Sequence, residues 1–229
     1  MAPYVISCGV PERLERIIKH VSEPHLFFEH LLMKAYRGKI DGIPVTVASL
    51  GVGSPDASIA TELYFAAGGE CLIRVGSAGS LWKNLKIGDI VIATGAVRDE
   101  GTSGQYVPKE YPAVPDPTLT DSLMEAARKL DVPFERGIVW TTDAIFRETP
   151  EKISFWRSAG VKCVDMICSS LFVISQIYGK RAGAILAISD NLETNEEGFK
   201  SEEFRNAEAR AAQIAVESIK ILDKKFRMI

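Results

Sequence analysis

The sequence predicts an α/β protein, folded as a single domain over residues 1–229 with a central mixed β-sheet flanked by helices. Short apolar runs of strand length alternate with longer segments of helical period, which is the pattern of this fold class. The dipeptide Asp41-Gly42 separates two apolar runs and favours a tight hairpin of antiparallel strands, so the sheet should be mixed. No repeat, linker or low-complexity segment interrupts the chain, which favours one domain over two.

The expected elements have local signals at their ends. Pro11 follows the first apolar run and favours a helix start, because proline is tolerated in a first helical turn. Ser54-Pro55-Asp56 can cap and open another helix, and residues 67–69, Ala-Gly-Gly, end it. The expected strands are residues 4–8, 35–40, 44–50, 73–76, 87–97, 134–142, 161–166 and 181–189. The expected helices begin at Pro11 and Ser54 or cover residues 116–130, 149–159, 168–178 and 201–226.

The composition is that of an ordinary globular protein, with 46% hydrophobic and 25% charged residues. The formal net charge of −3 does not favour duplex nucleic acid as a partner, since such binding rests on many Lys and Arg that neutralise phosphates. Cys8, Cys71, Cys163 and Cys168 have no metal-ligand spacing, so we expect buried free thiols in a reducing compartment. The N-terminus has no basic region of a signal sequence and no apolar run is long enough to cross a membrane, so we expect a cytoplasmic protein.

Glycines and polar residues gather where three of the expected strands end. They are Gly9 and Arg13, then Gly76, Ser77 and Gly79 after the strand that carries Arg74, and finally Ser189 and Asp190. Ligands of α/β sheets bind at the carboxyl ends of strands. Glycines let backbone N–H groups approach an oxyanion, and the planar fork of an arginine matches phosphate. The spacing matches neither a Walker A motif nor GxGxxG, so a second interpretation stays open, in which Arg74 pairs with a carboxylate and the glycines only form turns.

Six segments resemble the nucleoside phosphorylase family, which includes uridine phosphorylase and the hexameric purine nucleoside phosphorylases. In chain order they are GVPER, SLGVGSPDASIA, IRVGSAGSLWKNLKIGDIVIATGAVRDEGTS, TTDAIFRETPEK, VDMICSSLF and AISDNL, and they cover nearly the whole chain. RDEGTS, YVP and TTDAIFRET together are most similar to the branch usually called uridine phosphorylase-like. The resemblance implies the fold of that family and its reaction, in which phosphate attacks C1′ of a nucleoside and releases the free base and ribose 1-phosphate.

The resemblance also implies two groups of site residues. Inorganic phosphate, the co-substrate, would be bound by Gly9, Arg13, Arg74, Gly76 and Ser77. The ribose and the base would be bound by Phe146, Asp165, Met166, Ile167, Ser189 and Asp190. Arg74 and Asp190 would be catalytic, because arginine-held phosphate stabilises the charge that develops on the sugar and Asp190 can protonate a purine at N7. An aspartate in this position also suits a turn or a helix cap, so that alternative stays open. No metal and no further cofactor is expected.

Three positions depart from the family's pattern. The family's V-E-M-E segment ends in a glutamate that binds the ribose hydroxyls, whereas this chain has Ile167 there and should bind ribose weakly. Asp165 is expected to point to the opposite side if this segment is extended. Val10 stands where the family has an aspartate. In the family, an arginine of a neighbouring subunit also binds the phosphate, but this chain has Leu31-Leu32-Met33 in that region, where His30 or Lys34 could substitute for it.

The sequence leaves two interpretations of which nucleobase the substrate carries. The segment Ser189-Asp190-Asn191 resembles the purine-acting members, while the branch resemblance points to uridine. The chain lacks the insertion that carries a uracil-binding glutamine–arginine pair, and Arg147 is expected either to contact the base or to pair with Glu148 or Glu151. We expect a phosphorylase of purine nucleosides or of broad specificity, with uridine phosphorylase, a nucleosidase and a catalytically weak nucleoside-binding homologue as alternatives.

The expected partners are a small-molecule nucleoside and phosphate, with no nucleic acid and no membrane. The resemblance implies a homo-oligomer, either a dimer or a hexamer. The apolar stretches at residues 25–28 and 31–33 would supply contact area that a monomer should not expose.

Overall fold

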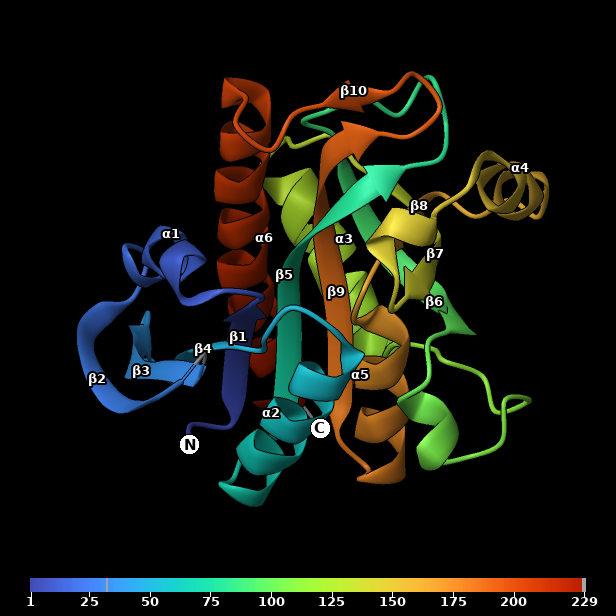
Figure 1. Ribbon diagram of the computed structural model, residues 1–229. Coiled ribbons are helices and arrows are strands. Elements are labelled where there is room, and N and C mark those ends of the chain that lie inside the picture. Colours follow the sequence, from blue (N-terminus) through green and yellow to red (C-terminus); the bar gives the residue numbers. More distant parts are fainter. Residues whose placement is uncertain (32, 228–229) are drawn as a thin grey trace.

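The computed structural model describes residues 1–31 and 33–227, and its elements alternate as the sequence predicts (Figure 1). The strands are β1 (Tyr4–Cys8), β2 (Ser22–His30), β3 (Met33–Ile40), β4 (Ile43–Ser49), β5 (Cys71–Ser80), β6 (Ile90–Asp99), β7 (Glu135–Thr142), β8 (Cys163–Asp165), β9 (Arg181–Asn191) and β10 (Glu196–Glu197). The α-helices are α1 (Glu15–Ile18), α2 (Ser54–Ala66), α3 (Pro117–Lys129), α4 (Pro150–Ser158), α5 (Cys168–Ile177) and α6 (Glu202–Arg227). Short 3-10 helices are η1 (Pro11–Arg13), η2 (Ser103–Gln105) and η3 (Ile145–Arg147).

The described strands form one mixed sheet, which confirms the predicted fold class. Their order is β10-β9-β6-β7-β8-β5-β1-β4-β3-β2, and β9 also pairs with β5. Strands β5, β8, β7, β6 and β9 therefore close into a ring, from which β1, β4, β3 and β2 extend. The pairs β1–β5 and β5–β9 are parallel, whereas β6–β9 and β5–β8 are antiparallel. The parallel pairs bring the carboxyl ends of β1, β5 and β9 to one edge.

The N-terminal third holds both a confirmed prediction and two differences. Asp41 and Gly42 adopt φ values of +48° and +82° and join β3 to β4 as the predicted hairpin. The helix expected at Pro11 is only the 3-10 turn η1 followed by the single turn of α1. Strand β2 has no counterpart in the prediction, because register shifts after Ser22 and Leu26 break the alternation that marks a strand.

The β2–β3 hairpin projects from the body of the molecule (Figure 1). Every residue of β2 is exposed, including the apolar Leu26, Phe27 and Phe28, and Leu31 after it is 85% exposed. Leu32 lies outside the described residues. Lys34 Nζ lies 3.2 Å from Glu29 Oε1 on the same hairpin. The apolar stretches that the sequence assigns to a subunit contact thus lie, as far as they are described, on this exposed hairpin.

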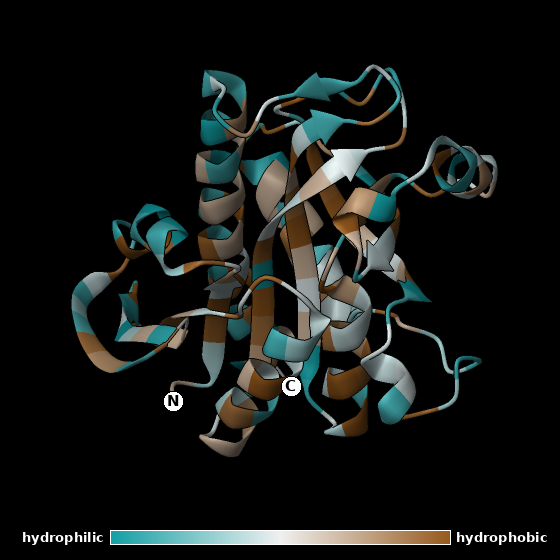
Figure 2. Ribbon diagram, in the orientation of Figure 1, coloured by the Kyte–Doolittle hydropathy of each residue, from teal (hydrophilic) through white to brown (hydrophobic). Residues whose placement is uncertain are grey.

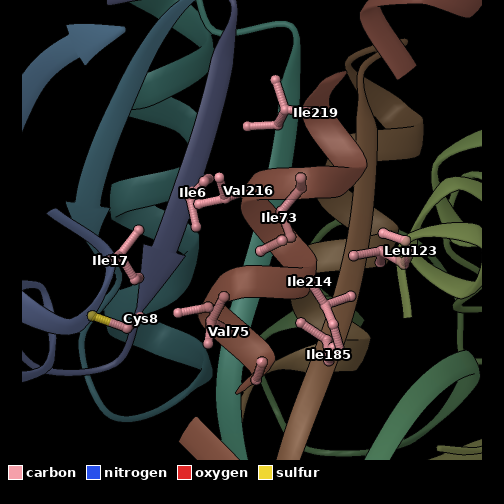
Figure 3. Packing of buried hydrophobic residues seen from close by; sticks show 14 of the residues in the cluster. Ile6, Cys8, Ile17, Ile73, Val75, Leu123, Ile185, Ile214, Val216 and Ile219 are labelled. Carbon is pink, nitrogen blue, oxygen red and sulfur yellow. The ribbon is translucent and has the colours of Figure 1, made fainter. Parts of the chain in front are cut away.

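Two apolar cores lie on the two faces of the sheet. In β1 and β5, Ile6 and Ile73 point to the face covered by α3 and α6, whereas Val5 and Leu72 point to the face covered by α2 and α5. This is the two-residue alternation of a strand that is buried on both faces. Figure 3 shows the first core, where Ile6, Ile73 and Ile185 pack against Ile214, Val216 and Ile219 of α6.

The helices are placed by their caps and apolar faces. Asp116 caps α3 by accepting a hydrogen bond from the backbone N–H of Leu119 at 2.8 Å. Hydrophobic and hydrophilic residues alternate along α6, whereas much of the interior strands is hydrophobic (Figure 2).

The four cysteines are free and buried, as expected. Among the described residues, no helix has both the length and the apolar character that a membrane crossing needs.

Candidate active site

A cavity of about 190 Å³ lies where β1, β5 and β9 end. The loop after β4 and the turn between β8 and α5 complete its wall. Most of the residues that the sequence assigns to ligand binding line it, namely Gly9, Arg13, Arg74, Ser77, Asp165, Met166, Ile167, Ser189 and Asp190. The chain topology therefore brings together segments that are far apart in the sequence.

Arg74 lies in β5 and is 5% exposed. Its Nη2 lies 3.2 Å from Asp165 Oδ2, so it does pair with a carboxylate, as the alternative interpretation held. Its Nε is buried and has no hydrogen-bond partner within the described part of the chain. A Cβ atom on Gly76 would lie 2.7 Å from Arg74 Cζ, so only glycine fits beside the guanidinium. Arg74 thus keeps one buried donor for an anion, and Gly76 lies behind it without lining the cavity.

Arg13 follows β1 in η1 and approaches the same end of the cavity. Its Nη1 donates a hydrogen bond to Ser77 Oγ at 3.1 Å, and its Nε lies 3.2 Å from Glu208 Oε1 of α6. Arg16 pairs with the same carboxylate, and Arg13 also lies over the ring of Phe204. Burial lowers the pKa of Arg13, which stays far above neutrality as for any guanidinium. Glu208 therefore holds Arg13 as a fixed cation beside Ser77.

Asp165, the last residue of β8, is fully engaged by hydrogen bonds. Thr141 Oγ1 donates to its Oδ1 at 2.8 Å, and the backbone N–H groups of Ile167 and Cys168 donate to its Oδ2 at 3.1 and 3.0 Å. These N–H groups belong to the start of α5, where a carboxylate is favoured. Asp165 thereby fixes Arg74 relative to the turn that carries Met166.

The expectation that Asp165 points to the opposite side is wrong. Asp165 and Ile167 both line the cavity. Strand β8 ends at Asp165, and residues two apart share a face even in an extended segment. Ile167 is 1% exposed and belongs to the apolar core beneath α2 and α5, so its side chain is packed rather than presented to a ligand.

Asp190 occupies the other end of the cavity, in β9, and caps no helix. Ser189 Oγ donates a hydrogen bond to its Oδ1 at 2.6 Å, and a Cβ on Gly79 would lie 2.8 Å from its Oδ2. Burial is the main cause that raises the pKa of Asp190, the hydrogen bond from Ser189 lowers it, and Glu197 raises it. A carboxyl with a raised pKa in a cavity is suited to carry a proton.

Glu148 lies at the same end of the cavity and was not among the predicted site residues. Burial and the nearby Asp190 raise its pKa to about 7. Among the described residues its carboxyl forms no hydrogen bond or ion pair, and Arg147 pairs with neither Glu148 nor Glu151. This end of the cavity therefore holds two acids, and neither forms an ion pair with a described residue.

Besides Gly76, a second predicted residue does not line the cavity. Phe146 is 97% exposed and does not line the cavity, whereas Ile145 and Phe199 do. In a 3-10 helix, residues three apart lie on one side, so Ile145 and Glu148 turn inward together and Phe146 turns outward. The family resemblance located this segment at the site but did not predict which of its side chains turns inward.

The fold and this cavity define a class of protein. It is an α/β protein in which a cavity at the strand ends has two fixed arginines at one end and two acids at the other, an arrangement suited to transferring a group to an anion from a leaving group that accepts a proton. Among the described residues, no group of His, Cys, Asp and Glu side chains is arranged to hold a metal ion.

Comparisons with known proteins agree with that class. A model of the Phosphorylase superfamily matches residues 3–220. The chain is 37% identical to a uridine phosphorylase of Thermococcus kodakarensis, over 97% of this chain and 83% of that protein. It is 34% identical to a guanosine phosphorylase of Halorubrum lacusprofundi, over 85% and 81% of the two proteins. The crystal structure of a purine nucleoside phosphorylase from Toxoplasma gondii in complex with immucillin-H has a TM-score of 0.91 at 26% identity, covering 98% of this chain and 93% of that chain.

The chain belongs to the nucleoside phosphorylases of the Phosphorylase superfamily, as the motifs of its sequence predict. Members of this family are pentosyltransferases, and this protein is an enzyme of that class.

Proposed function

We propose that this protein cleaves purine nucleosides, or nucleosides of broad specificity, by phosphorolysis to the free base and ribose 1-phosphate. The observation that carries the proposal is the polarity of the cavity: Arg13, Arg74 and Ser77 lie at one end, and Asp190 with Glu148 at the other. Such a site accommodates an anion and a leaving group that accepts a proton, with the sugar between them.

Phosphate is the nucleophile in this proposal. Arg74 Nε and the Arg13 guanidinium would hold the dianion, and Ser77 Oγ would donate to one of its oxygens. A phosphate oxygen forms the new bond to C1′ while the N-glycosidic bond breaks. The positive charge that develops on the sugar is stabilised by the adjacent phosphate, which the arginines orient for attack.

Asp190 is the proposed general acid. The electron pair of the broken bond passes into the base, and a proton from Asp190 is transferred to N7 of a purine. The raised pKa of Asp190 increases the fraction that carries this proton, and Ser189 fixes the carboxyl. No metal and no further cofactor enters the proposal.

Uridine phosphorylase is the second candidate. It is favoured by the uridine phosphorylase from Thermococcus kodakarensis, to which this chain is 37% identical. The guanosine phosphorylase and the purine nucleoside phosphorylase among the similar proteins favour the purine alternative. An acid at the base end has a purpose for purines, whose N7 accepts a proton, that a pyrimidine does not offer.

The test is release of base from inosine, guanosine, adenosine and uridine, with and without phosphate. Phosphate-dependent release with purines at least as fast as uridine is the expected result. Faster release from uridine would replace the purine proposal by the uridine candidate, and release that ignores phosphate would indicate a nucleosidase. Measurable binding without release would indicate a nucleoside-binding homologue.

We also propose a cytoplasmic homo-oligomer, in which the exposed apolar residues of the β2–β3 hairpin are covered by a second copy. Light scattering at micromolar concentration measures this directly. A monomeric mass would contradict it.

A further inference from the structure

The base end of the cavity has a second acid that the proposed reaction leaves unassigned. Glu148 lines the cavity together with Asp190 and reaches it from η3, whereas Asp190 reaches it from β9. The two carboxyls thus come from different elements and converge on one wall. Glu148 is only partly exposed, and no cation of the described residues forms an ion pair with it.

The charged groups that shift the pKa values of this pair are acidic. Asp190 of β9 is the group that acts on Glu148, and Glu197 of β10 acts on Asp190. Ser189 donates its hydroxyl hydrogen to Asp190, so the hydrogen bond favours ionisation of Asp190 rather than of Glu148. Within the described part of the chain, no lysine or arginine forms an ion pair with either acid. Near neutral pH, Glu148 is therefore close to the midpoint of its titration, with a pKa of about 7.

A purine presents two adjacent groups on the edge that carries N7. N7 is an acceptor in every purine, and the substituent beside it at position 6 is an acceptor oxygen in guanine and hypoxanthine but a donor amino group in adenine. If Asp190 faces N7, the neighbouring acid faces position 6. A carboxylic acid can donate to an oxygen, whereas a carboxylate can only accept from an amino group.

We propose that Glu148 recognises the substituent at position 6 of a purine, as a neutral acid that donates to a 6-oxo group and as a carboxylate that accepts from a 6-amino group. This inference rests on the proposed function for the orientation of the base. Glu148 is then a specificity-determining residue, and the preference between 6-oxopurines and 6-aminopurines depends on pH. Low pH favours the oxopurine and high pH favours the aminopurine.

The first experiment measures kcat/KM for inosine and adenosine between pH 5.5 and 8.5. For a group with a pKa near 7, the ratio of acid to carboxylate falls about a hundredfold from pH 6 to pH 8. The inosine/adenosine ratio of kcat/KM should therefore fall by at least about tenfold over this range. In Glu148→Gln it should be nearly constant, because an amide both donates and accepts at every pH. Glu151→Gln, a change of the same kind on an exposed side chain outside the cavity, should keep the wild-type dependence.

The second experiment does not need turnover. Calorimetry in buffers of different ionisation enthalpy counts the protons taken up when free hypoxanthine or adenine binds at pH 8. Hypoxanthine should take up about one proton more than adenine in the wild type, and the difference should vanish in Glu148→Gln. A residue with a merely structural role would not produce this difference.

The results separate the two proposals. Bases that bind with the expected proton difference, but without phosphate-dependent release from nucleosides, would support the role of Glu148 and contradict phosphorolysis. Phosphorolysis of both nucleosides with a pH-independent ratio, or a Glu148→Gln variant that keeps the wild-type pH dependence, would overturn the role of Glu148 and leave phosphorolysis in place. Absence of binding by either purine would overturn the role of Glu148 as well.

Discussion

The two ends of the cavity differ in how their charges are held. At the end proposed to bind phosphate, called the phosphate end, each arginine has a carboxylate partner, since Arg74 lies 3.2 Å from Asp165 and Arg13 lies 3.2 Å from Glu208. At the base end Asp190 and Glu148 have no cationic partner within the described part of the chain. One end is therefore a set of fixed ions, and the other is a pair of acids whose pKa values are raised.

This difference shows how a single cavity can serve two chemical tasks. Paired arginines stay charged and in place at every physiological pH, which suits the binding of an anion. Unpaired carboxyls in a partly buried wall retain protons near neutrality, which suits proton transfer. If the two ends are independent, a substitution at one end should leave the function of the other end unchanged.

Replacing Arg74 should have the largest effect. Arg74→Ala removes the buried donor proposed to bind phosphate and leaves Asp165 without its cation. Removal of one preorganised donor costs about 10²–10³-fold, and the loss of the guanidinium charge adds to it, so kcat/KM for phosphate should fall by about 10³-fold or more. Loss of one partner of a buried pair also costs about 3–5 kcal/mol of stability, although Thr141 and the start of α5 still donate to Asp165.

Calorimetric titration with phosphate and thermal unfolding separate these two losses. Arg74→Lys is the matched control, because it keeps the charge but not the planar fork. Its melting temperature should fall less than that of Arg74→Ala, and it should still bind phosphate weakly. Unchanged phosphate affinity in either variant would show that the anion binds elsewhere.

Asp190→Asn tests the base end. The amide cannot transfer a proton, so purine nucleoside cleavage should slow by about 10²–10⁴-fold, the range of general acid catalysis. Uridine cleavage should suffer less, and the affinity for phosphate should stay unchanged because Arg13 and Arg74 are untouched. Steady-state kinetics with both nucleosides, together with phosphate titration, provide the measurement. Equal losses for purine and pyrimidine substrates would assign Asp190 a structural role.

The phosphate end was the more predictable of the two from sequence. Arg74, Gly76 and Ser77 follow one another towards the carboxyl end of a single strand, which is where ligands of α/β sheets bind. Their carboxylate partners were not predictable, because Glu208 lies on α6 and resembles any other acid of an amphipathic helix. The sheet order alone brings α6 to Arg13, and no local pattern encodes that contact.

The base end depended on a turn that the sequence does not specify. Phe146 was expected at the ligand because of the family resemblance, but the three-residue period of η3 turns Ile145 and Glu148 inward instead. Asp190 was easier, since it ends an apolar strand at the edge where ligands bind. The turn η3 is thus the part of the site that the sequence located least well, although Gly9 and Arg13, which also lie outside strands, line the cavity as expected.

Ile167→Glu tests whether position 167, between the two ends of the cavity, contacts the ribose. The sequence resemblance implies that a glutamate here would restore ribose binding. The structure instead buries Ile167 in an apolar core, next to Asp165, so a new carboxylate would be desolvated beside a like charge. We expect a loss of about 3 kcal/mol in stability and no gain in kcat/KM for ribonucleosides.

Thermal unfolding and phosphorolysis of the same variant decide this case. Ile167→Gln, which has the same shape without the charge, should lose less stability. A gain of tenfold or more in kcat/KM with an unchanged melting temperature would show that this position faces the ribose after all.

Ser77→Ala should have the smallest effect on kcat/KM, and it gives the sharpest test of whether the two ends of the cavity act independently. Ser77 Oγ accepts a hydrogen bond from Arg13 Nη1 at 3.1 Å, while Glu208 holds Arg13 from the other side. Loss of one such hydrogen bond costs about 0.5–1.5 kcal/mol, so the KM for phosphate should rise by about 2- to 12-fold with little change in kcat. Because Asp190 lies at the other end, the effects of Ser77→Ala and Asp190→Asn on kcat/KM should multiply in the double variant, within about 0.5 kcal/mol. A larger coupling energy would mean that binding of phosphate and protonation of the base are linked through the cavity, and the two ends would then have to be treated as one unit.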